Sequence, residues 1–247
     1  MSHHVVEACE VRYAYADGTP ALAGVSFRIP HGEAVAVAGS NGAGKSTLLL
    51  HLAGCLLPAS GEVRIAGVAL TAQTAARVRR AVGLVFQDPD DQLFMPTVGE
   101  DVAFGPLNAG LPPDEVERRV AWALGRVGME RVRDRPPYKL SAGEKRAAAL
   151  AAVLALEPDV LVLDEPSSHL DPRGRRRLID LLKAFEHTRI LATHDLELAL
   201  EVCTRVIVLD GGAVVADGPI RDVLDDEPLM LAHGLERPHS LRHHHPH

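Results

Sequence analysis

Short apolar runs alternate along the chain with longer segments in which apolar residues recur at helical spacing. The short runs are bounded by Gly, Pro or Asp or end at a polar residue, and they cover residues 34–38, 82–86, 160–163, 189–193 and 206–209. Helical spacing is clearest within 114–127, where the apolar positions are Val116, Val120, Leu124 and Val127. Buried strands that alternate with helices are typical of an α/β fold with a mostly parallel sheet covered on both faces.

Two further regions modify this picture. Strand-like stretches at 11–15, 24–29 and 61–65 predict a small antiparallel β subdomain. Between about 88 and 157, Pro-rich loops and helices interrupt the strand rhythm, which predicts a helical subdomain inserted in the core. We therefore expect a single domain over residues 1–238, followed by a His-rich flexible tail at 239–247.

Composition and charge narrow the class of protein. A chain of 247 residues, of which 47% are hydrophobic, can bury a substantial core. Its net charge of −7 argues against a nucleic-acid partner, since phosphate backbones attract basic surfaces. Three scattered cysteines make no disulfide framework, and no apolar run reaches the ~18–20 residues of a membrane span. The N-terminus also lacks a secretion signal, so we expect a cytoplasmic protein that meets a membrane only through a partner.

Polar residues stand at the ends of four predicted strands. They are Gly39, Gln87, Asp164 with Glu165, and His194. In open α/β sheets, ligands bind beyond the carboxyl ends of the strands, so we expect these groups to meet in one crevice.

The segment after the strand at 34–38 has the pattern of a phosphate-binding loop. It reads GSNGAGKST and comprises Gly39, Ser40, Asn41, Gly42, Ala43, Gly44, Lys45, Ser46 and Thr47. The glycines let backbone N–H groups surround a β-phosphate, Lys45 reaches the β and γ oxygens, and Ser46 offers a hydroxyl to Mg²⁺. The flanking strand and helix are the context that this function requires, so the sequence predicts an ATP site.

Two acids follow the strand VLVL and extend the predicted chemistry. Asp164 is placed to hold the Mg²⁺ shell, and Glu165 to orient and deprotonate an attacking water. Two acids after a strand more often form a simple turn, so it is their combination with the phosphate loop that indicates ATP hydrolysis.

The stretch LSAGE at 140–144 has two interpretations. Ser141 and Glu144 have capping-box spacing ahead of an apolar run, which is typical of an ordinary helix start. An exposed helix N-terminus beside Gly143 is also a place where a γ-phosphate can bind. The residues alone leave both interpretations open.

Taken together, the motifs resemble those of the ATP-binding cassette (ABC) ATPases. They occur in the order GSNGAGKST, Gln87, LSAGE, VLVLDEP, SSHLD and His194, and the resemblance covers about residues 5–238. It implies a P-loop NTPase core of the ABC ATPase fold, ATP and Mg²⁺ as ligands, and two chains that sandwich two ATP molecules. It further implies that Tyr15, or with less support Tyr13, stacks on adenine, that Gln87 contacts Mg²⁺ and water, and that His194 senses the γ-phosphate. A core tyrosine is the alternative for Tyr15.

The resemblance also assigns residues that act across the dimer. Ser141, Gly143 and Glu144 would complete the ATP site of the opposite subunit, and Ser168 and Asp171 would couple the two sites. Two positions depart from the family pattern: Ala142 replaces the usual Gly, and His169 replaces a small residue. A Cβ at 142 would strain a backbone with positive φ or crowd the phosphate. Since neither departure removes a reacting group, we expect an active ATPase.

Residues 85–111 are similar to the ATPase subunits of energy-coupling-factor importers, which carry vitamins or transition metals. Gln87 and the acids Asp88, Asp90 and Asp91 lie where membrane subunits dock in this family, and an acidic groove suits a basic helix. A solvated loop is the alternative. The resemblance places the protein at the cytoplasmic face of the membrane as a peripheral subunit.

The histidines bear on the choice of cargo. Among the 13 histidines, those near the C-terminus are His233, His239, His243, His244, His245 and His247. Imidazole binds Co²⁺ and Ni²⁺, which favours a cobalt or nickel importer, with a vitamin importer as the alternative. An expression tag or a polar tail without function would give a similar composition.

Intact motifs in one chain favour a homodimer, whereas vitamin importers often pair two different ATPases. Two other classes compete with a transport ATPase. A soluble ABC ATPase is disfavoured by net acidity and a single ATPase domain, and a small-molecule kinase would have no reason to carry LSAGE and His194.

Overall fold

The computed structural model describes residues 4–168 and 170–242. A six-stranded sheet forms its centre. The strands lie in the order β10 (Ala213–Pro219), β9 (Arg205–Asp210), β3 (Ala34–Ala38), β8 (Thr188–Ala192), β7 (Val160–Asp164) and β6 (Val82–Val85). All neighbours pair in parallel except β10, which is antiparallel to β9. The predicted mostly parallel sheet is therefore confirmed.

The register aligns the carboxyl ends of three strands. Val37 of β3 and Asp164 of β7 both pair with Ala192 of β8. Because these ends are level, the residues that follow each strand emerge along one edge of the sheet. This edge carries the candidate site.

A second, four-stranded sheet confirms the predicted antiparallel subdomain. Its order is β2 (Pro20–Pro30), β1 (His4–Ala14), β4 (Ser60–Ile65) and β5 (Val68–Ala69). Each pair of neighbours is antiparallel.

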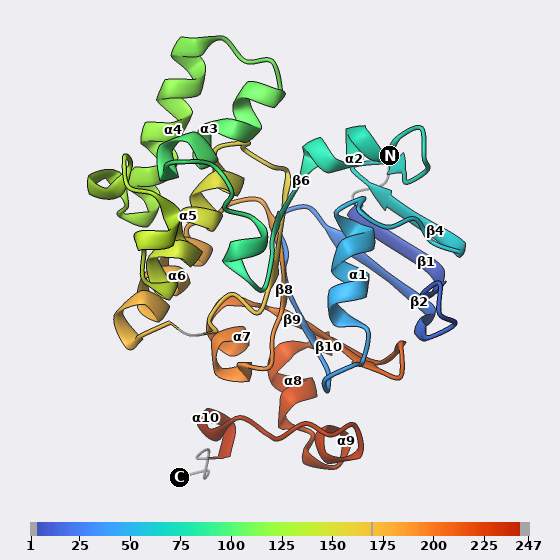
Figure 1. The fold of residues 1–247 in the computed structure, drawn as a ribbon. Helices are drawn as coiled ribbons and strands as arrows, with labels where there is room; N and C mark the ends of the chain where they lie inside the picture. Colours follow the sequence, from blue (N-terminus) through green and yellow to red (C-terminus); the bar gives the residue numbers. More distant parts are fainter. Residues whose placement is uncertain (1–3, 169, 243–247) are drawn as a thin grey trace.

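The helices cover both faces of the central sheet. They are α1 (Lys45–Leu52), α2 (Ala75–Ala81), α3 (Val98–Asn108), α4 (Pro113–Val127), α5 (Ala142–Leu154), α6 (Pro172–Lys183), α7 (Leu196–Val202), α8 (Ile220–Asp225), α9 (Glu227–Ala232) and α10 (His239–Arg242). Short 3₁₀ turns form at η1 (Pro89–Asp91), η2 (Glu130–Val132) and η3 (Pro137–Lys139). In Figure 1, helices α3 to α6 stand on one side of the sheet, and α1 with the antiparallel sheet stands on the other.

Strand alternation explains why the sheet is buried on both faces. In β3, Val35 and Val37 point into the core that contains α1, whereas Ala34, Ala36 and Ala38 point into the core of the helical side. Successive side chains of a strand face opposite ways, so an unbroken apolar run serves two cores.

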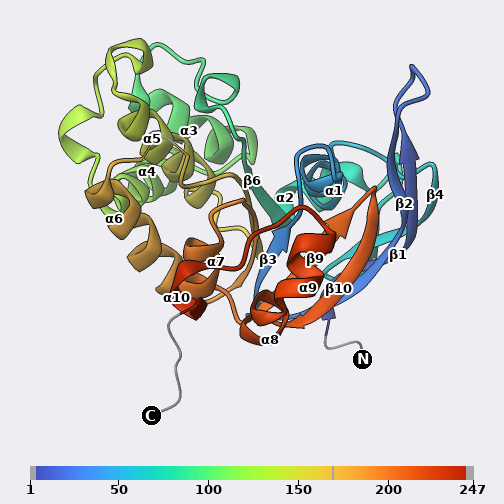
Figure 2. The same ribbon diagram turned by 90° about the horizontal axis from the view of Figure 1, so that it is seen from below.

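The structure bears on two predictions, the inserted helical subdomain and the flexible C-terminal tail. Helices α3, α4 and α5 lie between β6 and β7, within the segment predicted as a helical subdomain, and the division of the chain into one domain and a tail stays a prediction. Helix α8 lies against β9 and β10, α9 lies beside α8, and α10 lies beside α7 (Figure 2). The tail was expected to be flexible from residue 239, but His239–Arg242 form α10, and residues 243–247 lie outside the described part. None of the helices described is long and apolar enough to cross a membrane.

Candidate nucleotide-binding and catalytic site

The loop between β3 and α1 needs glycine at its two ends to avoid strain and collision. Gly39 has φ of 156° and Gly44 has φ of 100°. A Cβ on Gly39 would collide with the carbonyl oxygen of Leu209, and one on Gly44 with that of Ala21. Glycine therefore supplies both the positive φ and the close approach of neighbouring backbone that the loop needs.

Lys45 is buried at the start of α1. Only 7% of it is exposed, and its Nζ donates to the carbonyl oxygens of Gly39 at 2.7 Å and Ser40 at 3.0 Å. Burial lowers the pKa of Lys45, while the nearby carboxylates of Glu165 and Asp164 act to raise it. The ammonium group is thus held inside the loop, ready to exchange two carbonyls for phosphate oxygens.

Asp164 ends β7 and is buried beside the phosphate loop. Burial raises the pKa of its carboxyl group, and a hydrogen bond from Ser46 partly opposes that rise. Its position brings a carboxylate, the Ser46 hydroxyl and the Lys45 ammonium into one electrostatic cluster.

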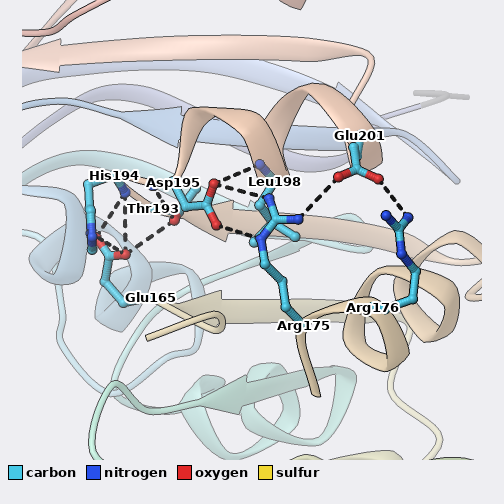
Figure 3. Close-up of polar contacts among 8 residues, drawn as sticks. All are labelled: Glu165, Arg175, Arg176, Thr193, His194, Asp195, Leu198 and Glu201. Carbon is cyan, nitrogen blue, oxygen red and sulfur yellow. Dashed lines mark hydrogen bonds and ion pairs between the residues drawn. The ribbon is translucent and has the colours of Figure 1, made fainter. Parts of the chain in front are cut away.

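Glu165 has an unusual backbone and a fully engaged side chain. Its φ is 46°, in the left-handed region that non-glycine residues seldom adopt, and only 7% of the residue is exposed. The Thr193 hydroxyl donates to Oε2 at 3.2 Å, and the His194 backbone N–H donates to Oε1 at 3.1 Å. His194 Nδ1 lies 2.7 Å from Oε2, as Figure 3 shows. The carboxylate is therefore fixed in place by the loop after β8.

These groups surround one pocket of about 380 Å³. Its lining residues are Tyr15, Thr19, Pro20, Ala21, Asn41, Gly42, Gly44, Lys45, Ser46, Thr47, Gln87, Asp164 and Glu165. Tyr15 is 40% exposed, and its hydroxyl lies 2.8 Å from Thr47 Oγ1. Tyr13 instead contacts Tyr15 and His51 edge-on, with centroids 5.3 and 4.7 Å away. The adenine-stacking role of Tyr15 stays a prediction.

The LSAGE stretch forms the capped start of α5 and is not among the residues that line this pocket. The Ser141 hydroxyl accepts from Glu144 N at 3.3 Å, and Ser141 N donates to the Glu144 carboxylate at 2.8 Å. A Cβ on Gly143 would meet only Leu170 Cδ2, at an ordinary 3.7 Å. Packing within the described chain therefore does not require glycine at position 143.

Of the two effects expected of a Cβ at Ala142, strain of a backbone with positive φ does not arise, and crowding of the phosphate stays a prediction. Ala142 is the first residue of α5 and is absent from the non-glycine residues with positive φ in the described chain. A Cβ is at no disadvantage at this helical position, because helical φ is negative.

The coupling loop leads from Glu165 into α6. Ser168 N donates to the Glu165 carbonyl oxygen at 3.2 Å, and Asp171 caps α6 by accepting from Gly174 N at 2.6 Å. The predicted departure at His169 lies outside the described residues.

Gln87 follows β6, lines the pocket and is exposed. Of the three acids after it, Asp90 is paired with a cation of the same chain. Asp88 Oδ1 accepts from Asp90 N at 2.9 Å, and the Asp90 carboxylate pairs with Lys145 Nζ at 2.6 Å. An acidic groove for a basic helix would thus rest mainly on Asp91 and Asp88.

Sequence reasoning missed three groups that contact these residues: Arg146, Thr193 and the pair Arg175–Asp195. Arg146 had a detectable signal, because it shares a helix face with Leu150 and Val153, so a charge stood on an apolar face. Thr193 and the pair Arg175–Asp195 had no such signal in the sequence, since their partners lie on different elements.

The residues predicted to hold Mg²⁺ fit that ion. Ser46, Gln87 and Asp164 line the same pocket, and all three offer the oxygen ligands that Mg²⁺ prefers. The raised pKa of Asp164 marks a buried carboxylate that a cation would stabilise.

A phosphate loop between a parallel strand and a helix, with buried acids at the end of β7, which β8 separates from β3, defines a nucleotide-hydrolysing protein of the P-loop class. Residues 22–168 match the family model described as ABC transporter. The chain belongs to this family and is an ABC transporter ATP-binding subunit with ATPase activity.

Individual relatives agree with this assignment. A Geobacter sulfurreducens protein named as an ABC transporter ATP-binding protein is 58% identical, over 98% of this chain and 97% of its own. The energy-coupling factor transporter ATP-binding protein EcfA of Methanothermobacter thermautotrophicus is 46% identical, over 96% of this chain and 78% of its own.

Two solved structures share the fold. The structure of cbiO1 from Clostridium perfringens, part of the ABC transporter complex cbiONQ, is 39% identical and matches 94% of each chain with a TM-score of 0.81. An ATP-binding cassette solved as a dimer with ADP and Pi is 28% identical and matches 87% of this chain and 98% of its own, with a TM-score of 0.78. The predicted ABC ATPase fold is therefore confirmed.

Proposed function

We propose that this chain is the ATP-hydrolysing subunit of an energy-coupling-factor importer for cobalt or nickel ions. One observation carries the catalytic part: Lys45, Ser46, Asp164 and Glu165 line a single pocket, whereas LSAGE is not part of its lining. The importer part is supported by the relatives named EcfA and cbiO1.

In the proposed reaction, Glu165 acts as the general base. It orients a water and accepts its proton while the water oxygen bonds to the γ-phosphorus, and the bond from that phosphorus to the β–γ bridging oxygen breaks. Lys45 neutralises the charge that develops on the β and γ oxygens. The N–H groups of the loop from Gly39 to Thr47 hold the β-phosphate, and Tyr15 stacks on the adenine.

Ser46, Asp164 and Gln87 would hold Mg²⁺, which stabilises the negative charge of the phosphates when bound. His194 is the proposed γ-phosphate sensor. Its side chain is 70% exposed although Nδ1 contacts Glu165, so the ring is free to turn toward a bound γ-phosphate. That turn would release the Glu165 carboxylate for its role as base.

A dimer is proposed because the LSAGE stretch does not line the pocket that contains the phosphate loop. Ser141, Gly143 and Glu144 are proposed to bind the γ-phosphate held by a second copy, and Ser168 with Asp171 to couple the sites. The surroundings of Gly143 are compatible with this role, since a Cβ there would meet only the Leu170 side chain, at 3.7 Å. The dimeric cassette with ADP and Pi supports the same arrangement.

The proposed docking surface for the membrane subunits extends from Gln87 to Asp91 and includes a nearby aromatic pair. Phe94 is 62% exposed and contacts Phe104, which is 40% exposed, with ring centroids 4.9 Å apart. Exposed aromatic side chains beside carboxylates suit an amphipathic basic helix. Such docking would make the chain a peripheral protein at the cytoplasmic face of the membrane.

The experiment has two parts. Phosphate release from ATP is measured for the purified chain and for Glu165→Gln, and we expect the variant to lose roughly 100-fold or more in rate. Equal, background-level rates in both would refute the catalytic proposal. The complex is then purified from its native membrane, and its subunits and bound metal are identified.

The second part separates the alternatives. Cobalt or nickel bound to the copurifying membrane subunits supports the proposal. A vitamin-binding subunit would support the vitamin-type importer, and the absence of any membrane subunit would support a soluble ABC ATPase. Deletion of residues 239–247 tests the His-rich tail: unchanged metal uptake would leave the tail no part in the choice of cargo.

A further inference from the structure

Arg146 is a buried cation that joins three segments of the candidate site. It lies in the second turn of α5 and is 7% exposed. Its Nη1 donates to the carbonyl oxygen of Glu165 at 2.8 Å, and its Nη2 donates to that of Gln87 at 2.8 Å. One side chain thereby holds the backbone of the proposed base and of the residue proposed to contact Mg²⁺ and water.

A stabilising role alone explains this arrangement poorly. Among the described residues, Arg146 forms no ion pair, and burial lowers the pKa of its guanidinium while Asp88, Glu165 and Asp164 act from a distance to raise it. An apolar side chain of similar size would fill the space without burying a charge. The two bonds also go to functional segments rather than to the ends of a helix.

The two hydrogen bonds of Arg146 help to hold an unfavourable backbone conformation at Glu165. Its φ of 46° is costly for a residue with a side chain, and such strain persists only where the surroundings impose it. The Glu165 N–H donates to Ala192 O at 2.8 Å, and Arg146 binds the carbonyl on the other side of the same residue. Arg146 is therefore one of the groups that fix the direction of the Glu165 side chain.

The position of Arg146 along α5 links this constraint to the proposed phosphate-binding start of the same helix. Arg146 lies five positions after Ser141, which is about 7.5 Å along a rigid helix. A shift of the α5 N-terminus on binding a phosphate thus moves the guanidinium, and with it the two carbonyls. A planar fork holds its two donors in a fixed relative geometry and so transmits that shift to both segments together, whereas the rotating donors of a lysine ammonium impose no such geometry.

We propose that Arg146 is a positioning residue that couples the phosphate-binding start of α5 to Glu165 and Gln87 of the same chain. In a dimer, ATP contacted by α5 of one subunit would align the base in that subunit's own site. This inference rests on the proposed function, because it uses the roles given there to Ser141, Gln87 and Glu165.

The test compares Arg146→Gln and Arg146→Lys with the control Arg119→Gln. Arg119 also donates from Nη1 to two backbone carbonyls, those of Ala155 and Leu156 at 3.4 Å, but at the opposite end of α5. For each variant, kcat and KM for ATP are measured per folded protein. ATP-driven dimer formation is measured in the Glu165→Gln background.

We expect Arg146→Gln to lower kcat roughly 10- to 100-fold, because a small misplacement of a base has that effect. Its KM for ATP and its ATP-driven dimer affinity should stay within about threefold of the parent, because the Arg146 side chain neither lines the pocket nor belongs to the α5 start. The kcat of Arg146→Lys, with one carbonyl still bound, should lie between those of the parent and Arg146→Gln. The Lys variant is used for the test if the Gln variant does not fold. Arg119→Gln should keep the kcat of the parent.

Two results would overturn the inference. One is a kcat equal to that of the parent in both Arg146 variants. The other is a loss of kcat that is not specific to the proposed role, because Arg119→Gln loses as much or because dimer affinity falls in the same proportion. The proposed function fails separately: if the parent and Glu165→Gln hydrolyse ATP equally slowly, the assigned roles are wrong whatever the Arg146 variants do.

Discussion

At the scale of single residues, the phosphate loop contains glycines that make unequal demands. Gly42 and Gly44 have φ of 81° and 100°, but only Gly44 faces a backbone carbonyl, that of Ala21, where a Cβ would stand. At Gly42 nothing lies within 4 Å of that position. The two residues therefore separate the cost of positive φ from the cost of a collision.

We expect Gly44→Ala to lower the free energy of unfolding by roughly 2–4 kcal/mol, from strain together with displacement of backbone. Gly42→Ala should lose about 1 kcal/mol, for strain alone. Urea unfolding without nucleotide measures both. Equal losses would show that the Ala21 carbonyl moves away without cost.

We expect the buried carboxylate of Asp164 to lower the stability of the fold while it supports ATP hydrolysis. Burial raises its pKa above the 3.8 of an ordinary aspartate, so its contribution to stability is fully present below the unfolded pKa and is lost as pH rises through the folded pKa. At neutral pH the ionised carboxylate is a cost that Mg²⁺ would offset. We expect Asp164→Asn, which keeps an acceptor for Ser46, to raise the thermal midpoint at pH 7 and to lose Mg²⁺-dependent ATP hydrolysis.

Thermal unfolding of both proteins at pH 7 and at successively lower pH, without nucleotide, checks this. The gap between them should narrow as pH falls and the native carboxyl group is protonated. A variant less stable than its parent at pH 7 would contradict the sign.

At the scale of elements, an arginine fork joins α6 to α7. Arg175 donates from Nε to Asp195 Oδ2 at 3.1 Å and from Nη2 to Oδ1 at 3.2 Å, and its Nη1 reaches Glu201 at 3.1 Å. Asp195 in turn caps α7 by accepting from Leu198 N at 2.8 Å. Figure 3 shows how this chain of contacts reaches Thr193, His194 and Glu165.

We expect Arg175→Ala to lower the free energy of unfolding by about 1.5–3 kcal/mol, since it breaks charged hydrogen bonds in a partly buried place. The neighbour Arg176 provides the control. Its side chain is 62% exposed, and it makes one bond to Glu201, so Arg176→Ala should stay within about 0.5 kcal/mol. Urea midpoints compare the two, and similar losses would reject a special role for the fork.

The elements also show where sequence reasoning succeeds. Strand β3 was predicted with its exact bounds because an apolar run buried on both faces carries its own signal. Strand β10 was missed because AVVADGP is partly exposed and contains Asp, Gly and Pro, which are poor strand formers. It forms because β9 offers it a free edge.

At the scale of the whole molecule, the exposed aromatic pair on the helical side is the testable part of the docking proposal. Phe94→Asp should leave the fold intact, because 62% of Phe94 is already exposed. It should reduce copurification of the membrane subunits several-fold by removing an apolar contact. Leu231→Asp is the matched control, since Leu231 in α9 is also 62% exposed. Equal copurification of the membrane subunits with the two variants would show that Phe94 is not part of the docking surface.

The sequence by itself determined the alternation of strands and helices, the phosphate loop and the strand-end acids. Each of these rests on periodicity, glycine or adjacency along the chain, so a linear pattern is enough. Only the tertiary structure decided that Arg146 binds the carbonyls of Gln87 and Glu165, and that Arg175 reaches Asp195. These contacts join residues on different elements, and their distances exist only once helices α5 and α6 pack beside the sheet.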